Sequence, residues 1–172
     1  LRRTLVLVAD HELNPSSFAA RVTASTGASL AACALSGYAT LSGPRHGDAS
    51  AQALVYLRQA LSNEATEPDM SDPIPAIGHA LYPNGDPRAK ALLKWMQLEP
   101  ELKQIIKHAE RTAEQPANID MALAALCLRL DLPEDAPFLI FAAGRMVGWI
   151  AHAIEQSVSG KPIRPRAKYL GP

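Results

Sequence analysis

Apolar residues at helical spacing, in segments separated by proline, constrain the fold of this chain most. One helix face is predicted in the segment that ends near Leu61 and another over residues 101–114, on two sets of residues (Ala53, Leu54, Leu57 and Leu61; Leu102, Ile105, Ile106 and Ala109). Proline lacks a backbone donor and ends helices, so the prolines between such segments indicate connections. The sequence therefore predicts an all-α architecture of orthogonally packed helices.

Further helices are predicted over residues 18–36, 88–96, 121–130 and 138–157. Expected N-caps are Ser16 or Ser17 for the first and Asp48 or Ser50 for the helix ending near Leu61. Residues 62–77 contain three prolines and several acids, which favours a surface connection. Residues 5–9 read as a strand on local propensity, although so short an apolar run also fits a buried helix.

Length and charge narrow the classes of function. A chain of 172 residues can bury a substantial core, and its 17 basic residues balance 17 acidic ones without any basic run. This balance argues against nucleic acid or an anionic membrane as a partner and favours a small molecule. The apolar start after Arg2 and Arg3 is too short for a signal peptide, and no long uninterrupted apolar run follows, so we expect a cytoplasmic location. The chain lacks an initiator methionine and is expected to be cut from a longer protein.

Cys33 and Cys127 stand alone in apolar runs without metal-ligand spacing. Buried free thiols in a reducing compartment are therefore expected.

A histidine-bearing turn over residues 43–50, GPRHGDAS, opens a helix and is the first candidate for chemistry. Proline fixes one torsion and glycine permits close approach, so the ring of His46 can face a cleft beside a helix N-terminus. The positive end of a helix favours a neutral imidazole, which can polarise a carbonyl. A purely structural or exposed histidine is the alternative.

Other polar residues occupy similar positions. A second Gly-His pair places His79 in a loop before Asp86-Pro87-Arg88, which starts a helix. Asp120 follows Asn118-Ile119 at a helix start, where a simple N-terminal carboxylate is the alternative to chemistry. Arg145 lies among small and apolar residues, where its burial is costly without an acid or an anionic ligand.

Taken together and in order, these motifs resemble the citrate synthase family. The resemblance rests on residues 9–14 (ADHELN), 43–47 (GPRHG), 78–79 (GH), 86–89 (DPRA), 118–120 (NID), 141–152 (FAAGRMVGWIAH) and 163–166 (IRPR). It spans nearly the whole chain but only the C-terminal part of a full-length family member, so the upstream helices are expected to be absent.

The resemblance implies a transferase of the tricarboxylic acid cycle that condenses acetyl-CoA with oxaloacetate and hydrolyses the thioester to citrate and CoA. Asp120 would remove a methyl proton while His46 donates a hydrogen bond to the thioester oxygen. His79 would polarise the ketone of oxaloacetate. The remaining site residues (His11, Arg88, Arg145 and Arg164) would bind its carboxylates. No metal and no permanently bound cofactor is implied, and acetyl-CoA serves as a co-substrate.

The resemblance also implies a homodimer, in which Arg164 completes the partner's pocket, and two lobes. Residues 1–48 and 133–172 would belong to a large lobe, and residues 49–132 to a small mobile lobe.

The chain departs from residues common in the family at Arg45, Asp48, Ser50 and Pro83. Arg45 and Asp48 could pair with each other or alter the pKa of His46, and Pro83 replaces a frequently basic position near the expected CoA site. A 2-methylcitrate synthase that uses propionyl-CoA, and a catalytically weak regulatory or binding protein, therefore stay open as alternatives. A metal site formed by His11, His46 and His79 is a third, although the spacing matches no compact ligand motif.

Overall fold

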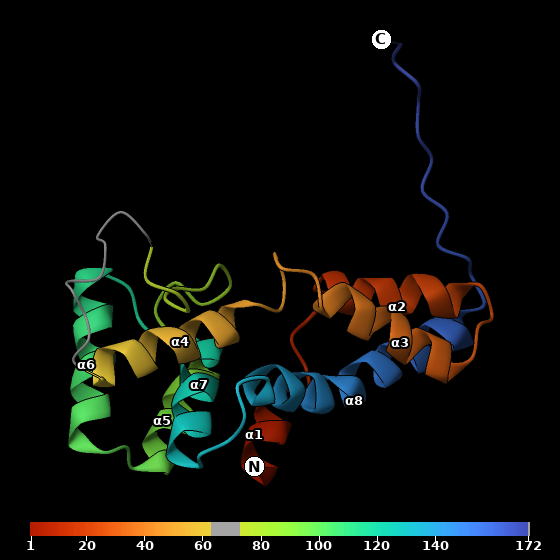
Figure 1. The fold of residues 1–172 in the computed structure, drawn as a ribbon. Helices are drawn as coiled ribbons and strands as arrows, with labels where there is room; N and C mark the ends of the chain where they lie inside the picture. Colours follow the sequence, from red (N-terminus) through yellow and green to blue (C-terminus); the bar gives the residue numbers. More distant parts are fainter. Residues whose placement is uncertain (63–72, 172) are drawn as a thin grey trace.

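The computed structural model describes residues 1–62 and 73–171, and these residues form eight α-helices (Figure 1). The helices are α1 (Arg2–Leu7), α2 (Pro15–Ser25), α3 (Leu30–Leu41), α4 (Ala49–Leu61), α5 (Pro87–Met96), α6 (Pro100–Thr112), α7 (Ile119–Arg129) and α8 (Ala136–Ser159). The described residues contain no strand beyond an isolated antiparallel bridge between Ile77 and Ala117. The all-α prediction is confirmed.

The strand interpretation of residues 5–9 is wrong. Residues Arg2–Leu7 form α1, and Val8 directly after it is fully buried. Tertiary packing decides here, since Gly144 and Gly148 of α8 let the two segments approach closely. A Cβ at Gly144 would lie 2.9 Å from the Leu5 carbonyl oxygen, and one at Gly148 would overlap the Ala9 carbonyl. Short β-prone runs follow such packing rather than local propensity.

The single helix predicted over residues 18–36 is also wrong, because the chain turns between α2 and α3. Gly27 has a φ of +80°, which glycine adopts without strain, and Ser29 then caps α3 by accepting a hydrogen bond from the Ala32 amide. The alanines on both sides of the turn continue a helical pattern, so the sequence pattern does not indicate where α2 ends and α3 begins.

Side-chain caps begin α2, α5 and α7, which lie beside the cavity described below. Asn14, rather than the expected Ser16 or Ser17, caps α2, with Pro15 in the first helical position. Asp86 caps α5 and Asn118 caps α7. Asp48 precedes α4 as predicted but makes no capping hydrogen bond. Its carboxylate instead accepts from the side-chain nitrogen Gln52 Nε2 at 2.8 Å.

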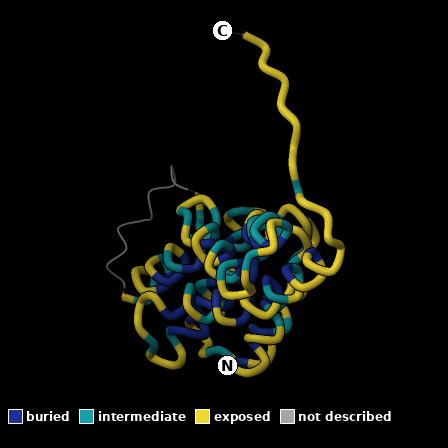
Figure 2. Tube along the Cα trace, turned by 90° about the vertical axis from the view of Figure 1, so that its right-hand side faces the viewer, coloured by how far each residue is buried: buried dark blue, intermediate teal, exposed yellow. Residues whose placement is uncertain are grey.

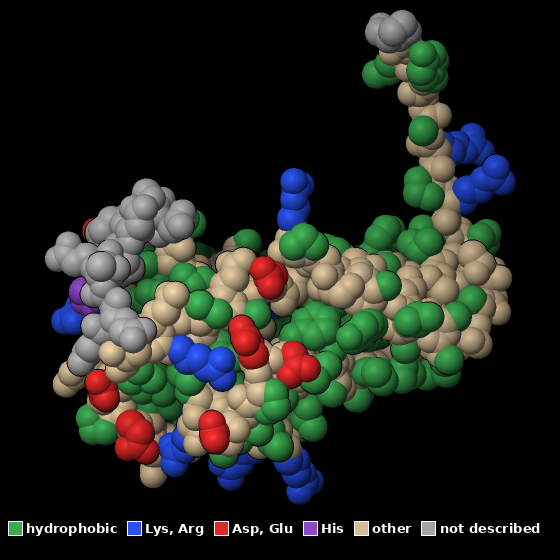
Figure 3. Space-filling view, in the orientation of Figure 1, with side chains coloured by type: hydrophobic (Ala, Val, Ile, Leu, Met, Phe, Trp, Pro, Cys, Tyr) green, Lys and Arg blue, Asp and Glu red, His purple; other side chains and the backbone are tan. Residues whose placement is uncertain are grey.

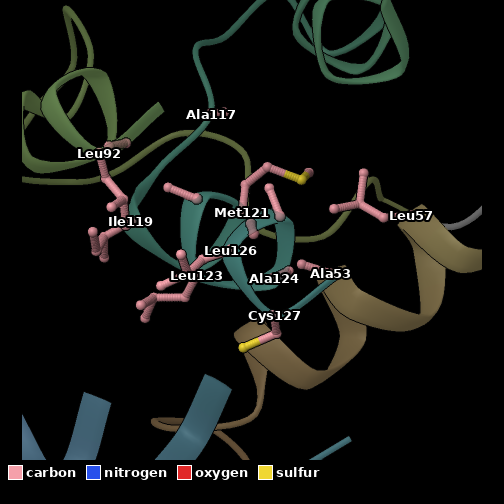
Figure 4. Packing of buried hydrophobic residues seen from close by; sticks show 14 of the residues in the cluster. Ala53, Leu57, Leu92, Ala117, Ile119, Met121, Leu123, Ala124, Leu126 and Cys127 are labelled. Atoms are coloured by element: carbon pink, nitrogen blue, oxygen red, sulfur yellow. The ribbon is translucent and has the colours of Figure 1, made fainter. Parts of the chain in front are cut away.

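Helix α7 lies at the centre of the larger of two hydrophobic clusters, which we call the α7 cluster (Figure 4). Every residue from Met121 to Cys127 is buried. Residues of α4, α5 and α6 pack around them, among them Ala53, Leu57, Leu92 and Ile106. Burying this many aliphatic side chains is the main stabilisation of the region.

The second cluster, called the α8 cluster, joins α2, α3 and α8. Its buried residues are mostly small (Ala20, Ala24, Cys33, Leu41, Ala142, Trp149 and Ala153). Gly37 of α3 faces the Trp149 ring, where a Cβ would lie 2.6 Å from the indole. Although α8 has the length and hydropathy of a membrane-crossing helix, it packs against α1, α2 and α3 in this fold.

Both cysteines are buried free thiols, as predicted. Most of the predicted connection after α4, residues 63–72, lies outside the described residues. Beyond Gly160, which ends α8 with a φ of +63°, the chain runs as an extended and largely exposed tail (Figure 2).

Candidate functional site

A cavity of about 110 Å³ lies where the α7 and α8 clusters meet. Its polar lining contains three histidines and one carboxylate from four distant parts of the sequence (His11, His46, His79 and Asp120). Asn14, Ser50, Gly47 and the apolar residues Leu41, Ile119, Phe138 and Phe141 complete the wall. Polar groups that converge in a hollow with apolar walls are typical of a small-molecule site.

His11 and His79 lie edge to face, with ring centroids 4.9 Å apart. The Tyr82 ring lies 5.0 Å from His79, and the Arg88 guanidinium sits 5.3 Å from the centre of that tyrosine ring. Arg88 is therefore held close to both histidines by stacking as well as by hydrogen bonds.

Arg145 is completely buried within α8. Its Nε donates to the Val8 carbonyl at 3.0 Å, and its guanidinium lies 5.3 Å from the centre of the Phe141 ring, which lines the cavity. Burial, together with the charge of Arg88, lowers the pKa of Arg145 to about 10, so it stays protonated at neutral pH. No carboxylate among the described residues pairs with it.

Four buried nitrogen atoms around the cavity make no hydrogen bond to any described residue. They are His11 Nδ1, Arg88 Nη1, and both Nη atoms of Arg145. Leaving charged donors buried and unpaired is costly, and an anionic ligand would satisfy them. Guanidinium groups match carboxylates in a bidentate geometry.

Asp86 fixes the geometry of Arg88. Its carboxylate accepts from Arg88 Nε at 2.9 Å, from Nη2 at 2.8 Å and from the Arg88 amide, and it also accepts from the Ile119 amide at 3.0 Å. Burial raises the pKa of Asp86, but the hydrogen bonds and charge of Arg88 outweigh it and lower the pKa overall. One ionised carboxylate thus joins the start of α5 to the start of α7.

Asp120 lies in the first turn of α7, but it does not cap the helix. That role belongs to Asn118, whose side-chain oxygen accepts from the Asp120 amide at 2.9 Å and whose Nδ2 donates to the Gly78 carbonyl at 2.8 Å. The Asp120 carboxylate thus lines the cavity beside the His79 loop. Burial, with a contribution from the charge of Asp86, raises its pKa to about 6. It is mostly ionised at neutral pH and close to the pKa favoured for a general base.

Ser16 holds the His46 ring from behind. Its Oγ lies 3.1 Å from His46 Nε2 and accepts from Trp149 Nε1 at 3.1 Å. The same hydroxyl donates to Asn14 Oδ1 at 3.0 Å, and its single proton can turn to His46 Nε2 instead. In that second arrangement the neutral ring carries its proton on Nδ1 and can donate a hydrogen bond from there.

All three histidines are held neutral near pH 7. Burial and the charges of Arg88 and Arg145 lower the pKa of His11 to about 4. Burial followed by the charge of Arg145 lowers the pKa of His46, and burial followed by Arg88 lowers that of His79. Neutral rings can donate hydrogen bonds to a polarised oxygen without giving up a proton.

The structure thus brings His11, His46, His79 and Asp120 to one cavity and places Arg88 and Arg145 beside it. Arg164 is not among them, because it is exposed in the extended tail and does not line this cavity. Among the residues that the structure describes, no three His, Cys, Asp or Glu side chains are grouped to hold a metal ion, so the metal alternative gains no support.

Arg45 and Asp48 do not pair with each other, which was one of two alternatives, since Asp48 accepts from Gln52 Nε2 and Arg45 is exposed. Ser50 is buried and lines the cavity, and Pro83 is exposed in its loop. The sequence did not indicate Ser16 as the support of His46, and it indicated Asp86 only as part of a turn that starts a helix. The aspartate two residues before an arginine at a helix start could have signalled the second role.

The comparisons with known proteins agree with these observations. The sequence-family model for the C-terminal domain of citrate synthase matches residues 1–166. The chain therefore belongs to the citrate synthase family.

Two curated relatives illustrate the range of the family. The chain is 33% identical over 189 residues to citrate synthase 2 of Bacillus subtilis, covering 99% of this chain and 50% of that protein. It is 32% identical over 185 residues to a 2-methylcitrate synthase of Shewanella oneidensis, covering 98% of this chain and 49% of the relative. The chain spans about half the length of the curated relatives it matches.

Solved structures share the fold. A citryl-CoA lyase from Hydrogenobacter thermophilus superposes with a TM-score of 0.85 at 26% identity, covering 99% of this chain and 75% of that one. A ternary complex of citrate synthase from Thermoplasma acidophilum with carboxymethyl coenzyme A and oxaloacetate gives a TM-score of 0.80 at 26% identity, with 98% and 51% covered.

Proposed function

We propose that this chain carries the catalytic half-site of an enzyme that condenses acetyl-CoA with oxaloacetate to give citrate and CoA. The observation that carries the proposal is the group of unpaired buried donors on His11, Arg88 and Arg145 beside a cavity that also contains Asp120 and His46. A dicarboxylate such as oxaloacetate supplies the acceptors that these donors lack.

The proposed chemistry divides among three groups. Asp120 removes a proton from the methyl group of acetyl-CoA, while His46 donates a hydrogen bond to the thioester oxygen and stabilises the enolate. The enolate carbon attacks the ketone carbon of oxaloacetate, whose oxygen accepts a hydrogen bond from His79. The alkoxide that forms takes up one proton, and Asp120 releases the one that it removed, so the protons balance. Water then hydrolyses the citryl thioester. The raised pKa of Asp120 and the lowered pKa values of the histidines suit these roles.

Acetyl-CoA is a co-substrate in this scheme, and no resident cofactor or metal takes part. The thermoplasmal enzyme binds oxaloacetate and a CoA analogue together, which supports the same pair of ligands here.

The full enzyme would be a homodimer in which Arg164 of the extended tail reaches the partner's site, because that arginine is exposed and does not line this chain's own cavity. Its lobes would follow the expected bounds, with residues 49–132 in a small lobe that closes over the substrates and residues 1–48 and 133–172 in a large lobe, and it would work in the cytoplasm. The α7 cluster draws most of its residues from the small-lobe range and supports this division.

Calorimetric titration with oxaloacetate tests the carboxylate site, and CoA release from acetyl-CoA and oxaloacetate tests turnover. We expect saturable oxaloacetate binding that Arg88→Gln weakens at least tenfold. Binding without turnover, in a preparation that contains the upstream half, would favour the regulatory or binding alternative.

A 2-methylcitrate synthase activity is the second candidate, supported by the relative from Shewanella oneidensis. Its substrate, propionyl-CoA, differs from acetyl-CoA only by one methyl group on the acyl chain. The small residue Ser50 in the cavity wall leaves room for that group. The ratio of kcat/KM for propionyl-CoA and acetyl-CoA separates the two. Citryl-CoA cleavage is the reverse of the same bond-forming step, and incubation with citryl-CoA tests it.

A further inference from the structure

A second and larger cavity lies between α5 and α6, and it shares no residue with the site described above. Its volume is about 570 Å³, within the range typical of small-molecule pockets. Aliphatic side chains of Leu93, Leu98 and Ile106 line it together with three lysines (Lys94, Lys103 and Lys107).

The lysines leave this pocket positively charged, in contrast to the zero net charge of the whole chain. Among the described residues, none of the three pairs with an acid. Glu110 is the acidic side chain in the lining, and its Oε1 accepts a hydrogen bond from the Ala117 amide at 3.0 Å. The lining therefore has a formal excess of two positive charges.

The walls of the pocket are fixed by contacts outside it. Gln97, where α5 ends, adopts the left-handed conformation with a φ of +48°, and its carbonyl accepts from Arg129 Nη1 of α7 at 2.7 Å. The Glu110 contact joins the other wall to the segment before α7. A pocket held in this way needs little ordering when it binds a ligand.

We propose that this pocket binds an amphipathic phosphate monoester. Lys103 and Lys107 are one helical turn apart on α6 and lie on the same face, so their ammonium groups can meet one phosphate, with Lys94 approaching from α5. A phosphate monoester carries close to two negative charges at pH 7, which matches the excess in the lining. The aliphatic floor takes the organic part of the ligand. The proposal does not depend on the citrate synthase activity.

Hexyl phosphate is the probe, and calorimetric titration of the whole chain is the measurement. We expect a single site that binds hexyl phosphate at least tenfold more tightly than inorganic phosphate or hexanol, since each of these supplies half of the recognised chemistry. Saturating oxaloacetate should leave the affinity for hexyl phosphate unchanged.

The variant Lys103→Gln/Lys107→Gln should weaken hexyl phosphate binding at least tenfold and leave oxaloacetate binding unaffected. Glutamine keeps helix propensity close to that of lysine, so α6 should persist, which circular dichroism checks. The matched control, Lys161→Gln/Lys168→Gln in the exposed tail, removes the same charge and should bind as the unaltered chain does.

Three outcomes would overturn the proposal: equal affinity for hexyl phosphate and inorganic phosphate, unchanged binding in the folded α6 variant, or displacement of hexyl phosphate by oxaloacetate. The last would place the phosphate in the carboxylate site instead. Loss of oxaloacetate binding alone would count against the proposed function and not against this pocket.

Discussion

The two helix clusters differ in how completely they bury their apolar side chains. The α7 cluster encloses large aliphatic residues from several helices, and charged side chains gather over the α4–α7 end of the surface (Figure 3). The α8 cluster buries mainly alanines around Trp149, while Leu35, Val147 and Val158 stay 66%, 65% and 83% exposed. Hydrophobic side chains dominate that end of the surface in Figure 3. The first cluster is a complete core, whereas the second leaves an apolar face uncovered.

The cavity joins these unequal halves, and each half supplies a different part of the chemistry. Helix α7 brings Asp120, and the loop tied to it by Asn118 brings His79. The α8 cluster brings Arg145 and supports His46 through Ser16 and Trp149. The complete core thus holds the proposed base, and the incomplete one holds the proposed hydrogen-bond donor His46 and the proposed carboxylate ligand Arg145.

The largest expected effect tests the packing contrast itself. Leu57 of the α7 cluster is fully buried, so Leu57→Ala should lower the free energy of unfolding by about 2–5 kcal/mol through lost burial and a cavity. Leu35→Ala on the exposed face of α3 should change it by about 0.5 kcal/mol or less. Urea unfolding measures both. Equal losses would show that the exposed face of α3 is as tightly packed as the α7 core.

Asp120→Asn separates the base from the rest of the site. Asparagine keeps the size of the side chain and Asn118 still caps α7, so oxaloacetate binding and the fold should persist. Exchange of the methyl protons of acetyl-CoA should fall by roughly two or more orders of magnitude, the scale of a lost general base.

His46→Gln should impair the same exchange step. In the unaltered enzyme, kcat/KM should fall as the pH drops through about 6, because protonation of Asp120 in the free enzyme removes the base. Near-normal exchange in both variants of an active preparation would contradict the proposed mechanism.

Arg145→Gln tests the contribution of the α8 half. Losing charge-assisted hydrogen bonds to a carboxylate should weaken oxaloacetate binding about 10- to 100-fold in calorimetry. The free variant should unfold at no lower denaturant concentration than the unaltered chain, because a buried cation without an acidic partner is removed. Weaker binding accompanied by lower stability would instead assign Arg145 a structural role.

The sequence predicted the helical class and most helix positions because proline and apolar spacing act locally. It failed where alanine hides a boundary, as at the turn between α2 and α3, and where long-range packing overrides propensity, as in α1. Side chains of the cavity were found through their motifs. The role of Ser16 beside His46 was not predicted, because its partner Trp149 lies 133 residues away and no local sequence pattern indicates such a contact.

The smallest expected effect is on the free energy of unfolding, which the ionised Asp120 carboxylate should lower. The pKa of Asp120 is about 6 in the folded chain, above the ordinary value of 3.8, so the folded state binds more protons between those limits. Stability therefore falls as the pH rises from about 4 to 6.

Asparagine does not titrate, so Asp120→Asn should gain stability relative to the unaltered chain, by about 1–2 kcal/mol at pH 7.5 and close to nothing at pH 3.5. The expected gain in stability is smaller than the whole pKa shift implies, because Asp120 is half-buried and its charge interacts favourably with the helix N-terminus. Urea unfolding at both pH values measures it, with Asp135→Asn at the exposed start of α8 as the control for loss of one negative charge. A loss of stability in Asp120→Asn at pH 7.5 that disappears toward pH 3.5 would mean that the ionised carboxylate stabilises the fold, as a structural residue would, and would contradict the destabilised carboxylate expected of a base in the cavity.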